Sequence, residues 1–563
     1  MWCPMKRLEE LSSLYGDQAE WVANEVNGLL ERYRNAIAQK HASTTKLTAS
    51  DAILITYGDS IQTSESNPLQ TLSHFCQAQL ADCISAIHLL PCFPYTSDDG
   101  FSVQDYYQID PELGDWDDVT AMSGSFDIML DAVVNHCSQH NAWFKSFLEG
   151  DPEFDDYFIT ADPDVDYSAV TRPRALPLLH RYPKQGGKVS VWTTFSEDQV
   201  DLNYHSAKVF VQVLDVLLFY VAQGSRFIRL DAIAFIWKEL GTTCLHLPQA
   251  HLIIQLYRHY IEQLAPNMSI ITETNVPHDE NVSYFGDGHN EAHLVYNFTL
   301  PPLLMHSLHE EEVETLTRWA NTLQLPSDEV CFFNFTASHD GVGVRPLKNI
   351  VSDESIQRLA DIAQAHGGFV SMRDNGDGTK SPYEINCNYL DFATAPDAEN
   401  GLRAQRFLLT QSVMLAMPGV PGIYYHSILG SENDRQAALD SGINRRINRQ
   451  KLTTSTLEAE LADSNTLRHL VFSGYRRLMQ ARRNDAAFDP FGTAHYQQQG
   501  KVFIIHRVSD SGDVYALHNF SSDSSEVTQL PAQLTDQLSG ETVSGGSLTL
   551  QPMEYRWLKV IAD

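Results

Sequence analysis

Two charged residues interrupt an apolar stretch of this sequence. In RFIRLDAIAF, residues 226–235, Arg229 and Asp231 stand two positions apart among aliphatic and aromatic residues. Residues two apart on a strand point to the same side, so the guanidinium could orient the carboxylate and hold it ionised. Because an unpaired buried charge is costly, the two residues form either a structural ion pair or part of a reactive site.

Other carboxylates and histidines close other apolar stretches. These residues are Asp131, Asn135, His136, Glu273, His339 and Asp340. Two carboxylates in one pocket can carry out glycosyl transfer, in which one attacks the anomeric carbon and the other protonates the leaving oxygen. Three carboxylates could instead ligate a metal ion, with a histidine as a further ligand. The cation Arg229 opposes that alternative, and we predict neither a metal ion nor a cofactor.

The elements that would position these residues recur from residue 52 onward. Eight short apolar stretches alternate with helical ones: AILITYGD, SAIHLLPCF, FDIMLDAVVNH, RFIRLDAIAF, SIITETNV, HLVYNFTL, VCFFNFTASHD and VMLAMPGVPGIYY. Such runs are typical of a parallel sheet covered on both faces, and eight of them predict an α/β fold, the (β/α)₈ or TIM barrel. The carboxyl ends of the strands face the active site of such a barrel, so we expect Asp231, Glu273 and Asp340 to converge there.

Segments outside the eight stretches predict further parts of the fold. Residues 17–40 place apolar side chains at helical spacing, which predicts an N-terminal helical extension. Two gaps are too long for ordinary loops and predict inserted subdomains, and short strand-like stretches near the end predict an antiparallel β domain. The predicted boundaries are 1–50 for the extension, 51–486 for the catalytic barrel with insertions at about 143–200 and 343–400, and 487–563 for the C-terminal β domain.

Composition limits the possible partners. The 563 residues carry 39 Lys plus Arg against 72 Asp plus Glu, a net charge of −33, which argues against nucleic acid or an anionic membrane as partner. No window of about 18 apolar residues predicts a membrane span, and the acidic start of the chain predicts no secretory signal. The eight cysteines form no C-x-x-C pair, which favours reduced core thiols. We therefore expect a cytoplasmic protein, and a homodimer is possible.

Four motifs resemble a known family. DAVVNH, FIRLDA, ITETN and FTASHD are similar, in order and spacing, to the motifs of the α-amylase family of retaining α-glucosidases and transglucosidases, and the resemblance covers roughly residues 52–563. AIHLLPCFPYTSDDGFSVQDY, RPRALP, SPYEIN and SGINRRINR further resemble the sucrose phosphorylase branch of that family. The resemblance implies transfer of glucose from an α-glucoside to inorganic phosphate, with retention, to give α-glucose 1-phosphate.

The resemblance also implies roles for single residues. Asp231 would be the nucleophile, Glu273 the general acid/base, and Asp340 would hold the 2- and 3-hydroxyls of glucose. Such an acid requires a raised pKa for Glu273, which burial and an ionised Asp231 would provide. The implied glucose-binding residues are His136, His339, Phe101 as an aromatic platform, and the pair of Asp98 and Arg445; the implied phosphate contacts are Arg174 and Tyr383.

Each of these residues also has a simpler explanation when it is taken alone. The histidines could be structural, Asp98 could serve a turn, and Phe101 could belong to the core. The loop with Arg172 and Arg174 could be a solvated surface segment. A barrel that binds without catalysis is a further alternative, although no catalytic carboxylate is missing.

Two departures from sucrose phosphorylase concern the leaving group. Asn275 stands where that enzyme has a histidine that contacts fructose, and Glu384 stands where it has glutamine after the phosphate-contacting tyrosine. The helical extension and the TETNVPH stretch look more like glucosylglycerate phosphorylases of the same branch. We therefore expect 2-O-α-glucosylglycerate as the substrate, with sucrose, sucrose 6′-phosphate, glucosylglycerol, or an α-glucosidase or transglucosidase activity as alternatives.

Overall fold

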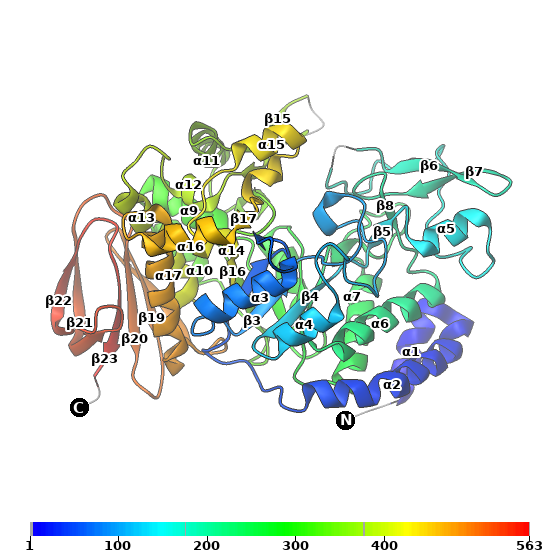
Figure 1. Cartoon of the computed structure of the whole chain (residues 1–563), viewed down its shortest axis with the longest axis horizontal. Helices are drawn as coiled ribbons and strands as arrows, with labels where there is room; N and C mark the ends of the chain where they lie inside the picture. The colour runs from blue at the N-terminus through cyan, green and yellow to red at the C-terminus, as the bar shows by residue number, and fades with distance from the viewer. Residues whose placement is uncertain (1–3, 175, 375–377, 562–563) are drawn as a thin grey trace. The chain divides into compact units, whose positions relative to one another are not determined.

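The barrel predicted from the sequence is confirmed by a computed structural model, which describes residues 4–174, 176–374 and 378–561. Parallel strands close a barrel in the hydrogen-bonded order β1-β16-β12-β11-β10-β9-β4-β3. Figure 1 labels three of these strands, β3, β4 and β16, among the helices. Their bounds are β1 Ile53–Thr56, β3 Ala86–Leu89, β4 Asp127–Ala132, β9 Ser225–Leu230, β10 Ser269–Thr272, β11 Leu294–Tyr296, β12 Cys331–Phe335 and β16 Val420–Tyr424. Each of the eight apolar stretches contributes one of these strands.

Helices alternate with the strands along the chain. They are α3 Pro68–Gln79, α4 Trp116–Ser123, α5 Ala142–Glu149, α6 Ala207–Ala222, α7 Pro248–Glu262, α8 His278–Val282, α9 Leu300–Glu310, α10 Glu314–Ala320, α11 Asp353–Ala365, α12 Tyr389–Ala393, α13 Asn400–Ala416, α14 Tyr425–Ile428, α15 Arg435–Ser441, α16 Thr454–Ala462 and α17 Leu467–Arg483. Helix α13 takes the first residues of the stretch VMLAMPGVPGIYY, of which only the second half is strand. A buried helix end and a buried strand are equally apolar, so periodicity cannot separate them.

The chain divides into two compact units. Unit 1 comprises Met1–Lys46, His88–Thr274 and Val282–Val295, and unit 2 comprises Leu47–Ile87, Asn275–Asn281 and Tyr296–Asp563. The boundaries predicted from the sequence do not coincide with these units, and they stay predictions.

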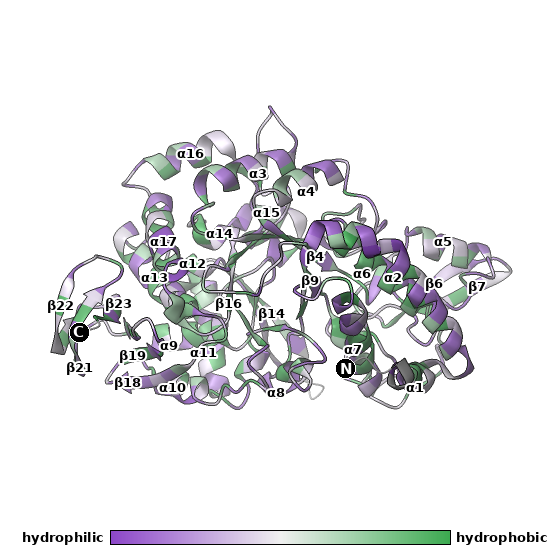
Figure 2. Cartoon of the chain, turned by 90° about the horizontal axis from the view of Figure 1, so that it is seen from below, coloured by the Kyte–Doolittle hydropathy of each residue, from purple (hydrophilic) through white to green (hydrophobic). Residues whose placement is uncertain are grey.

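The N-terminal extension belongs to unit 1. It forms helices α1 (Pro4–Tyr15) and α2 (Ala19–His41), and the apolar face of α2 is buried. Figure 2 shows hydrophilic and hydrophobic residues side by side along α2, as expected for a helix with one covered face. Asp215 on α6 accepts hydrogen bonds from Arg32 and Tyr33, both at 3.0 Å, so polar contacts join the extension to the helix that covers β9.

The long gap after β4 contains two pairs of short strands in unit 1. Strand β5 (His136–Ser138) pairs with β8 (Gln199–Asp201), and β6 (Leu179–Lys184) pairs with β7 (Gly187–Trp192). In unit 2, β13 (Val342–Gly343), β15 (Lys380–Asn386) and β14 (Phe369–Asp374) form a three-stranded sheet after β12.

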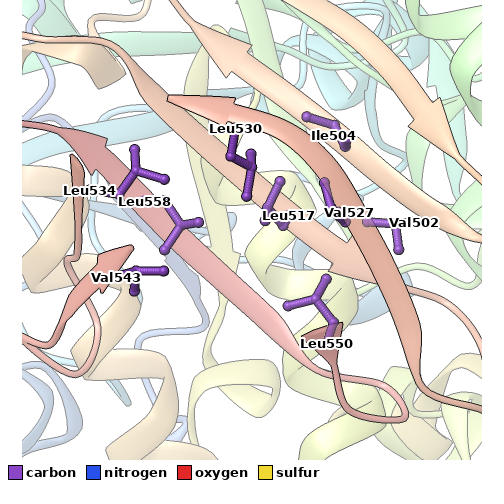
Figure 3. Packing of buried hydrophobic residues seen from close by; sticks show 9 residues of the cluster. All are labelled: Val502, Ile504, Leu517, Val527, Leu530, Leu534, Val543, Leu550 and Leu558. Carbon is purple, nitrogen blue, oxygen red and sulfur yellow. The ribbon is translucent and has the colours of Figure 1, made fainter. Parts of the chain in front are cut away.

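The C-terminal antiparallel domain is confirmed as a six-stranded sheet in the order β18-β19-β20-β23-β21-β22. Its strands are β18 Ala494–Gln499, β19 Val502–Arg507, β20 Val514–Asn519, β21 Ser525–Asp536, β22 Thr542–Leu550 and β23 Tyr555–Val560. One face carries a cluster of buried aliphatic residues, which Figure 3 shows. Burial of these side chains supplies the main stabilisation of the sheet.

Two predictions from composition can be compared with the structure. Every cysteine from Cys76 to Cys387 is a buried free thiol, whereas Cys3 lies outside the described residues. Among the described residues, none of the helices combines the length and the apolar character that crossing a membrane requires.

Candidate active site

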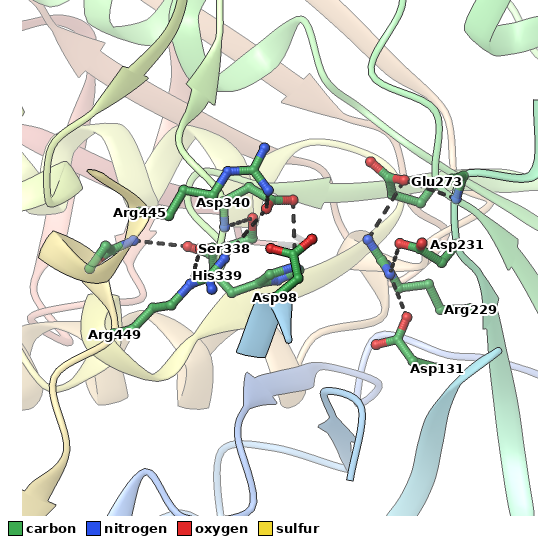
Figure 4. A network of polar contacts seen from close by, with 12 residues as sticks. Asp98, Asp131, Arg229, Asp231, Glu273, Ser338, His339, Asp340, Arg445 and Arg449 are labelled. Atoms are coloured by element: carbon green, nitrogen blue, oxygen red, sulfur yellow. Dashed lines mark hydrogen bonds and ion pairs between the residues drawn. The ribbon is translucent and has the colours of Figure 1, made fainter. Parts of the chain in front are cut away.

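Arg229 lies at the centre of a group of carboxylates in unit 1. It is only 1% exposed on β9 and donates from Nη1 to Asp131 and to Asp231, the latter at 2.8 Å. The Nη2 atom of Arg229 lies 3.7 Å from Oε2 of Glu273. Figure 4 shows the guanidinium surrounded by these three side chains. The predicted ion pair between Arg229 and Asp231 therefore exists, and it is part of a larger cluster.

The backbone directs Asp231 and Glu273 toward each other. The N–H of Glu273 donates to Leu230 O at 3.2 Å, which continues the register of β10 beside β9. Directly after Asp231, Ala232 adopts a φ of +49°, in the left-handed region that residues with a Cβ atom rarely occupy. This turn ends the strand at the nucleophile candidate, and the Ala232 N–H then lies 3.4 Å from Oε2 of Glu273.

The charge balance of this cluster favours one retained proton. Burial raises the pKa of Asp231 to about 8, against the lowering effect of Arg229, and the charges of Glu273 and Asp131 add to the rise. One guanidinium cannot neutralise three carboxylates, so Asp231 and Glu273 share a proton near neutral pH. Because Arg229 is closer to Asp231 than to Glu273, its charge favours the ionised form of Asp231 more than that of Glu273. The expectation that Arg229 alone keeps Asp231 ionised is therefore incomplete.

Three of the predicted sugar-binding residues lie together in unit 1. The Nε2 atom of His136 is 2.9 Å from Phe101 O, and the Phe101 ring is 7% exposed, with Cζ of Arg229 5.7 Å from its centroid. Asp98 has a φ of +55° and begins the turn that leads to Phe101. Turn chemistry at Asp98 and a site role are thus compatible, because the turn is what brings Asp98 and Phe101 beside His136.

Arg174 has a partner that the sequence did not indicate. Its Nη2 atom donates to Asp98 Oδ2 at 2.8 Å, and its Cζ lies 5.6 Å from the ring centroid of Phe195. Arg172, in the same loop, is exposed. The phosphate contact of Arg174 stays a prediction, and in this structure its guanidinium forms an ion pair with a predicted glucose-binding carboxylate.

A second cluster, in unit 2, surrounds Asp340. Arg445 contacts Asp340 Oδ1 at 2.5 Å and binds both carboxylate oxygens of Glu384, at 3.1 and 2.6 Å. Arg449 lies 3.8 Å from the same Asp340 oxygen and donates to His339 O at 2.8 Å. Figure 4 shows both arginine side chains directed at the segment that carries His339 and Asp340. The His339 ring, 4% exposed, meets Tyr57 edge-on at 6.1 Å.

The two predicted leaving-group residues, Asn275 and Glu384, and the predicted phosphate contact Tyr383 lie around β13 in unit 2. Gly343 pairs with Glu384, and the next N–H, from Val344, donates to Tyr383 O at 3.2 Å. A Cβ atom on Gly343 would lie 2.4 Å from the side-chain amide nitrogen of Asn275, so any larger residue at this position would require the Asn275 side chain to shift. Oδ1 of Asn275 is buried without a hydrogen-bond partner among the described residues, beside a cavity of about 20 Å³ that Asp340 also lines. A space of this size holds about one water molecule.

Sequence reasoning missed several residues that hold these side chains in place. Lys238, Asp201 and Gln199 are all buried around Asn135 and His136, and His88 lies 2.7 Å from the Asp131 carboxylate. One sign of these supporting residues is present in the sequence, an isolated charge in an otherwise apolar stretch, as in AFIWKEL around Lys238. This sign is weak because it does not show which residue the charge contacts.

A closed α/β barrel with paired carboxylates at neighbouring strand ends defines a class of protein suited to glycosyl transfer. The family model for the α-amylase catalytic domain matches residues 82–347. A glucosylglycerate phosphorylase from Spirochaeta thermophila is 47% identical, over 92% of this chain and 89% of that protein. One from Escherichia coli is 41% identical, over 98% of this chain and 100% of that protein. The chain belongs to the α-amylase family.

A solved structure agrees with this assignment. The crystal structure of sucrose 6F-phosphate phosphorylase from Thermoanaerobacter thermosaccharolyticum superposes with a TM-score of 0.73 at 25% identity. The match covers 85% of this chain and 94% of that protein, so the similarity extends well beyond the barrel strands.

Proposed function

We propose that this protein is a retaining phosphorylase that transfers glucose from 2-O-α-glucosylglycerate to inorganic phosphate and releases α-glucose 1-phosphate. The Arg229 cluster carries the proposal, because it places two carboxylates at adjacent strand ends and raises the pKa of one of them, Asp231, to about 8. The two relatives named glucosylglycerate phosphorylase, at 47% and 41% identity, support glycerate as the leaving group.

The first half of the proposed reaction forms a covalent intermediate. An Asp231 oxygen attacks carbon 1 of glucose while the carboxylic acid of Glu273 gives its proton to the glycosidic oxygen. The bond from carbon 1 to that oxygen breaks, glycerate leaves with the proton, and a glucosyl ester forms on Asp231. The ester on Asp231 is neutral and Glu273 is now a carboxylate, so the pair carries one negative charge both before and after this step.

In the second half, phosphate replaces glycerate. Glu273 accepts a proton from the phosphate hydroxyl, and that phosphate oxygen attacks carbon 1 as the ester bond to Asp231 breaks. Two inversions give net retention and restore the starting protonation of both carboxylates. We propose Arg174 and Tyr383 as the phosphate contacts; Arg174 would have to exchange its bond to Asp98 for one to phosphate.

The remaining roles follow the chemistry of each side chain. We propose that Asp340 accepts hydrogen bonds from glucose hydroxyls, with Arg445 and Arg449 fixing its carboxylate. The neutral imidazoles of His136 and His339 would contact further hydroxyls, Phe101 would face the apolar side of the ring, and Asp98 would close the glucose pocket. Asn275 and Glu384 are the proposed acceptor-side residues.

Phosphate-dependent release of glucose 1-phosphate tests the function. The purified protein is incubated with glucosylglycerate, glucosylglycerol, sucrose and sucrose 6′-phosphate, each with and without phosphate. We expect the highest kcat/KM with glucosylglycerate and phosphate. Phosphate-independent release of free glucose would establish a hydrolase instead, and a higher kcat/KM with a neutral glucoside would reassign the acceptor. We further propose a cytoplasmic location and a possible homodimer, which fractionation and light scattering would test.

A further inference from the structure

A buried lysine lies behind the predicted sugar-binding histidine. Lys238 follows the short helix after β9, and it is 7% exposed. Its Nζ atom lies 2.6 Å from Asp201 Oδ2 and donates to Asn135 Oδ1 at 2.8 Å. Burial of an ammonium group is costly even when the group is paired, so its retention calls for a specific reason.

The lysine fixes the orientation of the Asn135 amide. An ammonium group only donates hydrogen bonds, so the Asn135 atom that faces Lys238 is the amide oxygen. The NH₂ group therefore faces the other way, 3.1 Å from Asp201 Oδ2 and 3.2 Å from Nδ1 of His136. Asp201 is itself held by the N–H and the hydroxyl of Thr194, at 2.7 and 2.6 Å. The amide consequently presents a donor, and only a donor, to the imidazole.

The other end of the imidazole agrees with this assignment. Burial lowers the pKa of His136, which favours the neutral ring; Lys238 acts in the same direction, whereas Asp201 and Asp98 oppose it. A neutral ring that accepts at Nδ1 carries its proton on Nε2, and Nε2 lies 2.9 Å from the acceptor Phe101 O.

Gln199 is compatible with the same tautomer. Its amide nitrogen lies 3.2 Å from Nε2 of His136, but it also reaches Phe101 O at 3.0 Å and Asp98 Oδ2 at 3.2 Å. These two oxygens use both of its protons, so Gln199 does not require His136 Nε2 as an acceptor.

We propose that Lys238 is a positioning residue that acts through Asn135 to hold neutral His136 as its Nε2–H tautomer, so that the imidazole donates to Phe101 O and fixes the backbone that carries the proposed aromatic platform. The tautomer itself follows from the hydrogen bonds, whereas the role of Phe101 toward glucose rests on the proposed function. The opposite tautomer would turn an acceptor toward Phe101 O, which cannot donate. Residues that orient metal-binding histidines change activity by about 10- to 100-fold, and we expect a loss of similar size here.

Three variants separate tautomer control from plain stability. Asn135→Asp keeps an oxygen for Lys238 but replaces the donor at Nδ1 by an acceptor, so it should drive the proton to Nδ1. Lys238→Met removes the ammonium group while keeping a similar length. Lys208→Met is the matched control, because Lys208 on α6 is a partly exposed lysine that pairs with the carboxylate of Glu153. Lys238→Met leaves the buried Asp201 carboxylate without its cation, which destabilises the fold. Asn135→Asp is therefore the primary variant.

The readouts are the ring ¹⁵N chemical shifts of His136 and the kinetics of phosphorolysis. The His136 resonances are assigned by their loss in His136→Gln. We expect the Nε2–H pattern in wild type and in Lys208→Met, the Nδ1–H pattern in Asn135→Asp, and a fall in kcat/KM of about 10- to 100-fold with the change of tautomer. An Nδ1–H pattern in wild type, or an unchanged tautomer in both folded variants, would overturn the proposal. A wild-type protein that shows the Nε2–H pattern but no phosphorolysis would refute the proposed function and leave the tautomer assignment intact.

Discussion

The two arginine-centred clusters differ in how their charges balance. Around Arg229, one guanidinium contacts Asp131, Asp231 and, at longer distance, Glu273, and its side chain is 2% exposed. Around Asp340, the guanidinium groups of Arg445 and Arg449 face the carboxylates of Asp340 and Glu384. In these contacts, one guanidinium faces three carboxylates in the first cluster, whereas two guanidinium groups face two carboxylates in the second.

This difference separates chemistry from positioning. A shared, mobile proton is what acid and base catalysis requires, so the Arg229 cluster is suited to proton transfer and nucleophilic attack. A balanced group of ion pairs holds its members in fixed orientations, so the Asp340 cluster is suited to binding hydroxyl groups. Substitutions should therefore affect the two clusters in different ways.

The largest effect is expected from removal of the proposed nucleophile. Asp231→Ala should lower kcat for phosphorolysis by about 10⁴-fold or more, because no covalent intermediate can form. The measurement is glucose 1-phosphate release under saturating phosphate, with circular dichroism to check folding. If the variant keeps activity within tenfold of wild type, Asp231 is not the nucleophile, and the Arg229 cluster is not the reactive one of the two.

The next effect concerns the proposed acid. Glu273→Gln should slow phosphorolysis of glucosylglycerate by about 10²- to 10⁴-fold, the usual contribution of a general acid. With α-glucosyl fluoride, whose leaving group needs no proton, the glucosylation step should recover most of its rate. Equal losses with both donors would mean that Glu273 acts by some means other than protonation.

A smaller effect is expected in the Asp340 cluster. Glu384→Gln removes one anion from the group around Arg445, and we expect kcat/KM to fall about tenfold, in proportion to one lost charge-assisted hydrogen bond. If Glu384 acts by holding Arg445, the loss should be similar with glucosylglycerate and with α-glucosyl fluoride. A loss confined to glucosylglycerate would instead make Glu384 a direct acceptor contact.

The smallest effect is on stability. Burial raises the pKa of Asp231 from 3.8 to about 8, so the folded protein retains a proton that the unfolded chain releases between these values. The folded state then binds more protons than the unfolded state, and the free energy of unfolding falls as the pH rises from about 4 to 8. Asp231→Asn removes this dependence, so its Tm should exceed that of wild type by a few degrees at pH 8 and by less at pH 5.

Thermal unfolding of wild type and Asp231→Asn at the two pH values is the measurement. A difference in Tm that is the same at pH 5 and pH 8 would contradict the raised pKa. Phosphorolysis should also decline as the pH rises through about 8, because the carboxylate pair then loses its shared proton.

Local sequence predicted the barrel and the strand ends well. Apolar runs report burial directly, so the strand that ends at Leu230 and the position of Asp231 just beyond it could be expected from the sequence alone. The same holds for the stripe of apolar residues along α2. The strand and the apolar stripe both depend on residues that are close together in the sequence, and a single sequence shows such residues directly.

Pairings between distant residues could not be expected in this way. Glu384 binds Arg445 from 61 positions away, Arg174 binds Asp98 from 76 positions away, and Lys238 binds Asn135 from 103 positions away. Each is an ordinary charged or polar side chain whose partner is set by how strands and loops meet. The sequence by itself determined which carboxylates stand at the strand ends. Only the tertiary structure decided which arginines lie against each carboxylate. Those contacts distinguish the Arg229 cluster, which is suited to proton transfer, from the Asp340 cluster, which is suited to binding.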